Sequence, residues 1–323
     1  MAGQLQMPGA NFLRDSSASV SATPSSLQDE EAQFQTVTKE KMERELSGAT
    51  FYVDLISEGG ILHPNPEVVD KVMRDLQGIF HTLVSNSKIV STPSNPRFPD
   101  KGFSKEKKSY APFAHLLNKI IKTANQHISI PSLLRELFFH PFDGQVNDTY
   151  GSYKGLKPDG VGIFSELTPA ELSWDRIEVT FEARTSIPDM IRQSGTYARC
   201  CLLSNHRRSF AFVIAFQHKT LEAYIFVYHR SGLSSSRALD LRTHGGRKGL
   251  VSHMVGILSI KDGATYGLDT TRNQNTFCIN NRYYKILCHV YVRNCLRGRC
   301  TIVDSLQSKY TCRLRVTDVL FIA

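Results

Sequence analysis

Residues 177–184 read Ile-Glu-Val-Thr-Phe-Glu-Ala-Arg, and this stretch decides the fold class. Apolar and polar residues alternate strictly along it, which is the two-residue period of a β-strand. Upstream, Lys157-Pro158-Asp159-Gly160 is separated from this strand by a predicted turn at Thr168-Pro169 and by Trp174. The two faces of the predicted strand are Ile177, Val179, Phe181 and Ala183 on one side, and Glu178, Thr180, Glu182 and Arg184 on the other.

An Asp after a Pro, followed by Glu-x-basic on a later strand, resembles the core of the PD-(D/E)XK nucleases. In that family the Asp and Glu hold a divalent cation, and a Lys orients or activates the attacking water. The resemblance implies catalytic roles for Asp159, Glu182, Arg184 and Gln193, and Mg²⁺ ligation by Asp159, Glu182 and Glu106. Arg184 stands where the family has Lys. A guanidinium stays protonated and cannot take a proton, although it can hold a phosphate.

Two other interpretations of Asp159 and Glu182 stay open. The strand could be amphipathic with a solvated polar face, or the fold could be inherited with a decayed site. Gln193 and Tyr197 are one helical turn apart, so both could face the same pocket as the carboxylates.

Composition bounds the class of protein. The 323 residues are 41% hydrophobic, which is enough for one large core or two modest ones. The formal charge of +9 and the pI near 9.2 favour an acidic partner, most often nucleic acid, or indicate only a basic surface. A basic C-terminal cluster with interleaved Tyr residues offers a platform for nucleic acid, or the outward faces of strands; it comprises Arg282, Lys285, Arg293, Arg297, Arg299, Lys309, Arg313 and Arg315.

Cysteine usage and hydropathy predict the compartment. The seven Cys include the adjacent pair Cys200-Cys201 and no Cys-x-x-Cys, which indicates reduced thiols rather than a disulfide framework. No apolar run approaches the roughly 18 residues of a membrane span, and the first residues do not resemble a secretory signal. We therefore expect an intracellular protein, in the cytoplasm or nucleus, with no membrane partner.

The chain divides into three parts. Residues 1–48 are rich in Ser and predict a disordered tail. Residues 49–270 predict a helical lead-in followed by an α/β domain with a mixed sheet flanked by helices, and residues 271–323 predict short strands. We expect helices over 66–83, 113–121, 131–138, 186–203 and 246–260, and strands over 209–217, 221–230, 283–292, 300–306 and 314–322.

The region 150–310 resembles the N-terminal half of the fungal-type protein kinase family, through a series of short motifs that begins at Lys107 and ends at Val303. Each motif alone is weak, but their order along the chain matches that of the family. The landmarks are Lys107–Ala124, Pro158-Asp159, Trp174–Arg184, Gln193–Arg199, Arg208–Phe212, His229–Gly232, Tyr266–Asp269 and Leu296–Val303.

The resemblance implies a nuclease-like region followed by the first strands of a kinase N-lobe. There Gly298, Arg299 and Thr301 would belong to the turn that covers the phosphates of ATP, and Cys300 replaces the turn's second Gly. The printed sequence contains no His-Arg-Asp or Asp-Phe-Gly motif, so ATP would be a cofactor only of a full kinase domain. We expect a truncated kinase-family chain that acts as a non-catalytic accessory region with an unknown protein partner. The alternatives are a Mg²⁺-dependent nuclease and a non-catalytic nucleic-acid-binding module.

Overall fold

The computed structural model describes residues 40–58, 60–77, 102–129, 132–142, 144–146, 156–164, 172–271, 276–279, 282–292, 296 and 302–308. Its centre is an eight-stranded mixed sheet with strand order β1-β7-β6-β5-β4-β3-β2, and β8 pairs with β6. The predicted mixed α/β class is therefore confirmed. The strands are β1 (Thr50–Tyr52), β2 (Leu137–Pro141), β3 (Gly160–Phe164), β4 (Val179–Arg184), β5 (Phe210–Gln217), β6 (Glu222–His229), β7 (Gly232–Ser235) and β8 (Leu239–Asp240).

The middle of the sheet contains its crossover. β4 and β5 run parallel, so the chain must cross the sheet between them, and helix α5 (Ile187–Ser204) makes that connection. β5 and β6 then form an antiparallel pair. The turn between them ends at Leu221, whose positive φ of 59° lies in the left-handed region.

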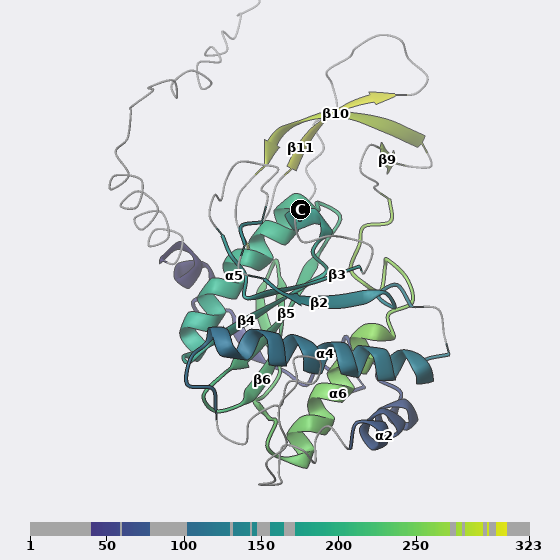
Figure 1. Ribbon diagram of the computed structural model, residues 1–323. Coiled ribbons are helices and arrows are strands. Elements are labelled where there is room, and N and C mark those ends of the chain that lie inside the picture. Colours follow the sequence, from purple (N-terminus) through teal and green to yellow (C-terminus); the bar gives the residue numbers. More distant parts are fainter. Residues whose placement is uncertain are drawn as a thin grey trace, which may run out of the picture. The chain divides into compact units, whose positions relative to one another are not determined.

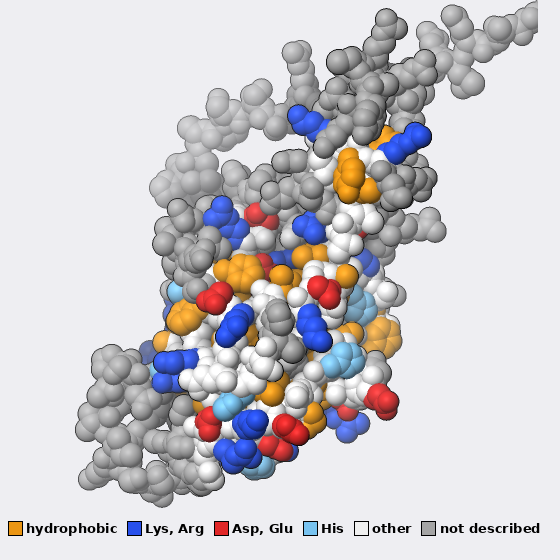
Figure 2. Space-filling model, turned by 90° about the vertical axis from the view of Figure 1, so that its right-hand side faces the viewer, with side chains coloured by type: hydrophobic (Ala, Val, Ile, Leu, Met, Phe, Trp, Pro, Cys, Tyr) orange, Lys and Arg blue, Asp and Glu red, His pale blue; other side chains and the backbone are white. Residues whose placement is uncertain are grey.

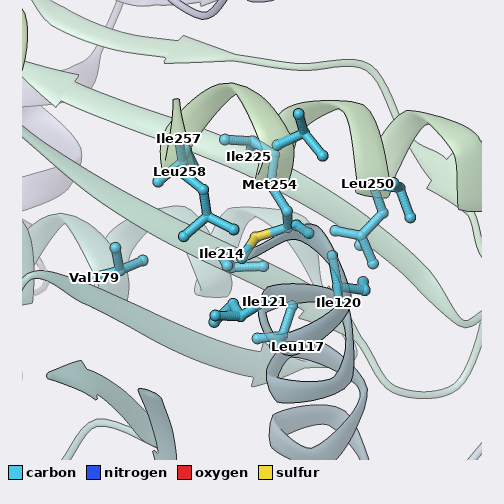
Figure 3. Close-up of a cluster of buried hydrophobic side chains, with 14 of the residues drawn as sticks. Leu117, Ile120, Ile121, Val179, Ile214, Ile225, Leu250, Met254, Ile257 and Leu258 are labelled. Atoms are coloured by element: carbon cyan, nitrogen blue, oxygen red, sulfur yellow. The ribbon is translucent and has the colours of Figure 1, made fainter. Parts of the chain in front are cut away.

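Helices cover both faces of the sheet (Figure 1). On one face lie α4 (Lys107–His127) and α6 (His244–Leu258), which pack on each other and on the sheet, and α2 (Pro66–Asp75) packs on these two helices. Figure 3 shows this core, in which Leu117 and Ile121 of α4 and Met254 of α6 meet Ile214 and Ile225 of the sheet. The other face is covered by α5 and by the 3-10 turn η2 (Trp174–Arg176).

Aromatic packing fixes α4 on the sheet. The Phe113 ring stacks on Phe216 with centroids 4.2 Å apart, and meets Phe181 edge-on at 5.6 Å. Such arrangements suit the charge distribution of the rings and add to the burial of large apolar surface. They hold the first half of α4, and with it residue 106, over β4.

Helix ends follow the sequence signals. Asn65 caps α2 by accepting a hydrogen bond from the Glu67 amide at 2.9 Å, and Pro66 occupies the first turn. Thr243 caps α6 by accepting from the Gly246 amide at 3.0 Å. These helices, together with α4 and α5, confirm the helices predicted around residues 66, 113–121, 186–203 and 246–260.

Two predictions need correction. The helix expected over 131–138 is wrong: residues 133–136 are turns, and Leu137 begins β2, where Leu137 and Phe139 point inward. The expected tail boundary at residue 48 also differs, because residues 40–46 are helical and Met42, Leu46 and Ala49 are buried. Apolar burial thus holds the chain from about residue 42, and residues 1–39 lie outside the described residues.

The C-terminal region contains a separate three-stranded antiparallel sheet. Its strands are β9 (Thr276–Ile279), β10 (Arg282–Val292) and β11 (Ile302–Ser308), in the order β11-β10-β9. The strand expected over 314–322 lies outside the described residues. None of the described helices has the length and apolar character needed to cross a membrane. Figure 2 shows one face of the protein, on which charged side chains of both signs are interspersed with hydrophobic ones.

Candidate carboxylate–arginine site

The register of β3 and β4 places the two predicted acids together. Gly160 pairs with Phe181, so Asp159 comes just before β3 and opposite the end of β4 that carries Glu182. The carboxylate of Asp159 accepts a hydrogen bond from the Ala183 amide at 2.8 Å, which fixes its orientation. Gly160 is needed here because a Cβ at this position would lie 1.8 Å from the Phe181 ring.

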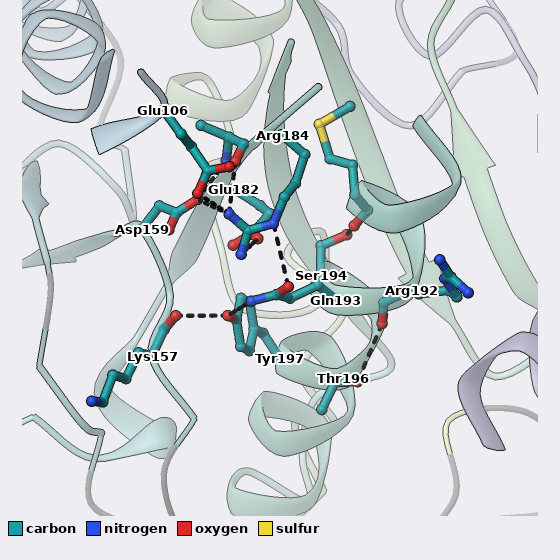
Figure 4. A network of polar contacts seen from close by, with 12 residues as sticks. Glu106, Lys157, Asp159, Glu182, Arg184, Arg192, Gln193, Ser194, Thr196 and Tyr197 are labelled. Atoms are coloured by element: carbon teal, nitrogen blue, oxygen red, sulfur yellow. Dashed lines mark hydrogen bonds and ion pairs between the residues drawn. The ribbon is translucent and has the colours of Figure 1, made fainter. Parts of the chain in front are cut away.

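The Arg184 guanidinium is the centre of the site (Figure 4). Its Nη2 lies 2.7 Å from Oε1 of Glu182, and its Nη1 lies 3.4 Å from Oδ2 of Asp159. Nη1 also donates to Oε1 of Glu106, the residue that precedes α4. One cation therefore contacts three acidic side chains that come from three different elements.

Helix α5 closes the other side of the site. Arg184 Nε donates to Oε1 of Gln193 at 3.3 Å, and Gln193 Nε2 donates to the Tyr197 hydroxyl at 2.7 Å. Tyr197 in turn donates to the Lys157 carbonyl at 2.7 Å, just before Asp159. The network thus runs from β4 through α5 and back to the Pro-Asp turn.

Burial controls the charge of the acids. Glu182 is fully buried and Asp159 is 5% exposed. Burial raises the pKa of Asp159 to about 6, although Arg184 and a hydrogen bond from Tyr110 act in the opposite direction. Burial and the nearby Asp159 raise the pKa of Glu182 well above its usual value, and Arg184 opposes that shift. The site therefore holds protons more tightly than solvated carboxylates would.

Glu182 and Arg184 lie close enough to form an ion pair, but their groups are not oriented for a hydrogen bond. Neither carboxylate oxygen of Glu182 has a hydrogen-bond partner among the described residues, in spite of the 2.7 Å approach of Arg184. The carboxylate of Glu182 can therefore still accept hydrogen bonds from another donor.

No group of three or more His, Cys, Asp or Glu side chains in the described part of the chain is arranged to hold a metal ion. The three carboxylates are gathered, but Arg184 lies among them and contacts each one. They fit a divalent cation only if the guanidinium moves away, because both cations need the same oxygen atoms.

The structure brings together the residues that the sequence singled out. Asp159, Glu182, Arg184, Gln193 and Glu106 form one connected network, and their chemical roles stay predictions. A solvated polar face of β4 is excluded, because Thr180 is 1% exposed and Glu182 is fully buried. The predicted phosphate turn, Gly298, Arg299 and Thr301, lies outside the described residues, as does most of the basic C-terminal cluster.

Two side chains beside the site were not singled out as site residues from the sequence. The Tyr110 hydroxyl donates to Oε1 of Glu106 at 2.8 Å, and burial raises the pKa of Tyr110. The four-residue spacing of Glu106 and Tyr110 on one helix face was the available signal. His218 follows β5 and is 3% exposed. Burial lowers the pKa of His218, and the negative charge of Glu106 acts in the opposite direction.

Three residues in the kinase-like motifs form a second buried network. Arg208 donates to the Ile177 carbonyl and to Oε2 of Glu178, both at 2.6 Å. The Tyr266 hydroxyl donates to the Glu178 carbonyl at 3.0 Å, and the Arg208 guanidinium lies 5.8 Å from the centroid of the Tyr266 ring. These contacts fasten the beginning of β4 to the segments around residues 208 and 266, so here the motif residues stabilise the fold.

Residues 161–310 match the family described as "Fungal protein kinase". The matched region begins at β3 and therefore contains β4, α5 and the residues of the second buried network. No curated protein and no solved structure matches the chain. The match supports the kinase-family resemblance for this region.

Proposed function

We propose that the α/β domain is a non-catalytic accessory region of a fungal-kinase-like protein, in which an arginine closes a nuclease-like carboxylate site. The single observation that carries this proposal is that Arg184 contacts Glu106, Asp159 and Glu182 at once. In this arrangement the guanidinium supplies the positive charge that a divalent cation would otherwise supply.

Two further features favour a closed site over an active one. A nuclease of this class needs water at the metal, and Glu182 is fully buried. The residue in the position of the family's Lys is an Arg, which cannot serve as a general base at neutral pH. Both features suit a site that stabilises the sheet, and the partner of the domain would then bind elsewhere.

The test is a comparison of the parent protein with Asp159→Ala. Both are incubated with single-stranded and double-stranded DNA and with RNA, in the presence of an excess of Mg²⁺ or Mn²⁺. We expect the same background cleavage from both proteins. Metal-dependent cleavage by the parent that Asp159→Ala abolishes would overturn the proposal.

The second candidate is a Mg²⁺-dependent nuclease with a PD-(D/E)XK-like core. It is favoured by the gathering of three carboxylates and Gln193 from α4, the β3 entry, β4 and α5. Burying an acid costs several kcal/mol unless it is paired, and in a nuclease a bound Mg²⁺ would provide that pairing. Salt-sensitive binding to DNA or RNA without cleavage would instead indicate the third alternative, a nucleic-acid-binding module.

We also propose a division of the chain near residues 40 and 270, with the kinase-like strands after residue 271. The burial of Met42 and Leu46 supports the first boundary, and the separate pairing of β9, β10 and β11 supports the second. Cys201 and Cys278 form no disulfide in the described part of the chain, which favours the proposed intracellular location.

A further inference from the structure

A cavity of about 420 Å³ lies between α4 and β2, away from the carboxylate–arginine site. Its lining includes His115 and Lys119 of α4 and Phe138 of β2, and none of the residues around Arg184. His115 lies about 14 Å further along the helix axis than Glu106, at about 1.5 Å per residue. The volume is within the range of about 300–1,000 Å³ that is usual for small-molecule sites.

The rim of the cavity is basic. Lys119, Lys122 and Arg135 line it, and Glu136 is its one acidic lining residue among those described. None of the three basic side chains forms an ion pair with a carboxylate in the described part of the chain. Three cations around one acid therefore favour an anionic ligand, because a ligand charge would complete pairs that the protein leaves open.

Two residues that line the cavity each have a buried polar atom without a partner in the described residues, Oδ1 of Asn125 and Nε2 of His115. Both atoms are closed to solvent, so a ligand reaches them only when the neighbouring side chains shift. Asn125 is held in place because its Nδ2 donates to the Arg135 carbonyl at 2.7 Å, so its oxygen is the free end. Burial and the neighbouring Lys119 lower the pKa of His115, and the ring is therefore neutral at pH 7. An uncharged imidazole and an amide oxygen both suit the hydrogen-bonding edge of a heterocycle.

The remaining surface is apolar and partly aromatic. Ile121 and Leu137 are buried, while the Phe138 side chain is 41% exposed. An exposed aromatic ring beside a basic rim is a surface on which a planar ring can stack.

We propose that this cavity binds a nucleoside monophosphate. The base would stack on Phe138 and place its N–H donor against Oδ1 of Asn125. The phosphate, with a charge of about −1.5 to −2 at pH 7, would pair with Lys119, Lys122 and Arg135. A phosphate alone leaves the ring and the amide unused, and a nucleoside alone leaves the three cations unpaired, so both halves of the ligand contribute. The proposal is independent of whether the Arg184 site is active.

Calorimetric titration of the parent protein with AMP, adenosine, ribose 5-phosphate and inorganic phosphate tests this inference. We expect AMP to bind at least tenfold more tightly than any of the other three. AMP binding no tighter than that of ribose 5-phosphate or inorganic phosphate would overturn the proposal, since the ring would then play no part.

Two variants test the two halves separately. Lys122→Ala combined with Arg135→Ala removes exposed charges, so the fold should persist, and we expect AMP affinity to fall at least tenfold. Phe138→Ser should weaken AMP at least fivefold and leave ribose 5-phosphate unchanged. The matched control is Lys71→Ala on the exposed face of α2, which should bind AMP like the parent.

The outcome is separable from that of the proposed function. Asp159→Ala should bind AMP with parental affinity, whatever it does to cleavage. AMP affinities of the double variant and of Phe138→Ser that equal the parental value would overturn the inference, provided that circular dichroism shows all variants folded.

Discussion

Removal of the Arg184 guanidinium is the strongest perturbation that the site offers. Arg184→Met keeps much of the length of the side chain but leaves Glu106, Asp159 and Glu182 without their shared cation. Breaking a buried ion pair by removing one partner costs about 3–5 kcal/mol, because the remaining charge stays buried. For a domain of this size that loss corresponds to a fall in Tm on the order of 10 °C.

The loss of unfolding free energy in Arg184→Met should increase with pH. The folded-state pKa of Asp159 is raised from 3.8 to about 6, so this group's stabilising contribution is fully present below about pH 4 and is lost as the pH rises through 6. Arg184 lowers the pKa of Asp159 and of Glu182 in the parent. Its removal raises both values further. The difference in unfolding free energy between parent and variant should therefore be largest at pH 8 and should shrink toward pH 5.

Urea unfolding followed by circular dichroism at pH 5, 6, 7 and 8 measures this difference. The matched control is Arg242→Met, because Arg242 contacts Asp240 at 2.8 and 2.9 Å on an exposed surface. Exposed pairs contribute about 0.2–1 kcal/mol, so this variant should lose little. A loss in Arg184→Met no larger than that of the control, or equal at pH 5 and pH 8, would refute the reasoning.

Three other changes have definite expected outcomes. The second candidate function predicts that Arg184→Lys gives Mg²⁺-dependent cleavage of DNA or RNA equal to or above that of the parent, because the shorter cation can release the carboxylates; lower cleavage than that of a cleaving parent would contradict it. Gly160→Ala should lower the unfolding free energy by about 1–3 kcal/mol in urea titrations, because its Cβ would overlap the Phe181 ring. Cys201 should resist thiol reagents in the native protein at pH 8 and react after unfolding, since burial raises its pKa to about 12; rapid native labelling at this position, located by mass spectrometry, would be inconsistent.

The sequence predicted the elements whose period was clear. The alternation over 177–184 and the apolar spacing of α4 and α5 translate directly into β4 and two helices, because one face of each must be buried. The meeting of Asp159 with Glu182 followed from two adjacent strands. Glu106, which the resemblance suggested as a third metal ligand, contacts the same Arg184, and its role as a ligand stays a prediction.

Other features depend on tertiary packing that no local pattern contains. The polar face of β4 is buried because β4 is flanked by β3 and β5 and covered by α5 on that side. Residues 131–138 contain Leu and Glu at helical spacing, yet pairing with β3 makes Leu137 and Phe138 part of a strand. The cavity between α4 and β2 follows from the same pairing, and the sequence held no sign of it.

Asn118 has a consequence beyond α4. Its side-chain amide donates to the Phe139 carbonyl at 2.8 Å and accepts from the Phe139 amide at 2.7 Å, so it meets the outer edge of β2 as a ninth strand would. Unpaired strand edges are where sheets of separate molecules join and where aggregation begins. The Asn118 amide therefore satisfies two backbone groups of the last strand in the described sheet, and its loss would leave the N–H and C=O of Phe139 open to another strand.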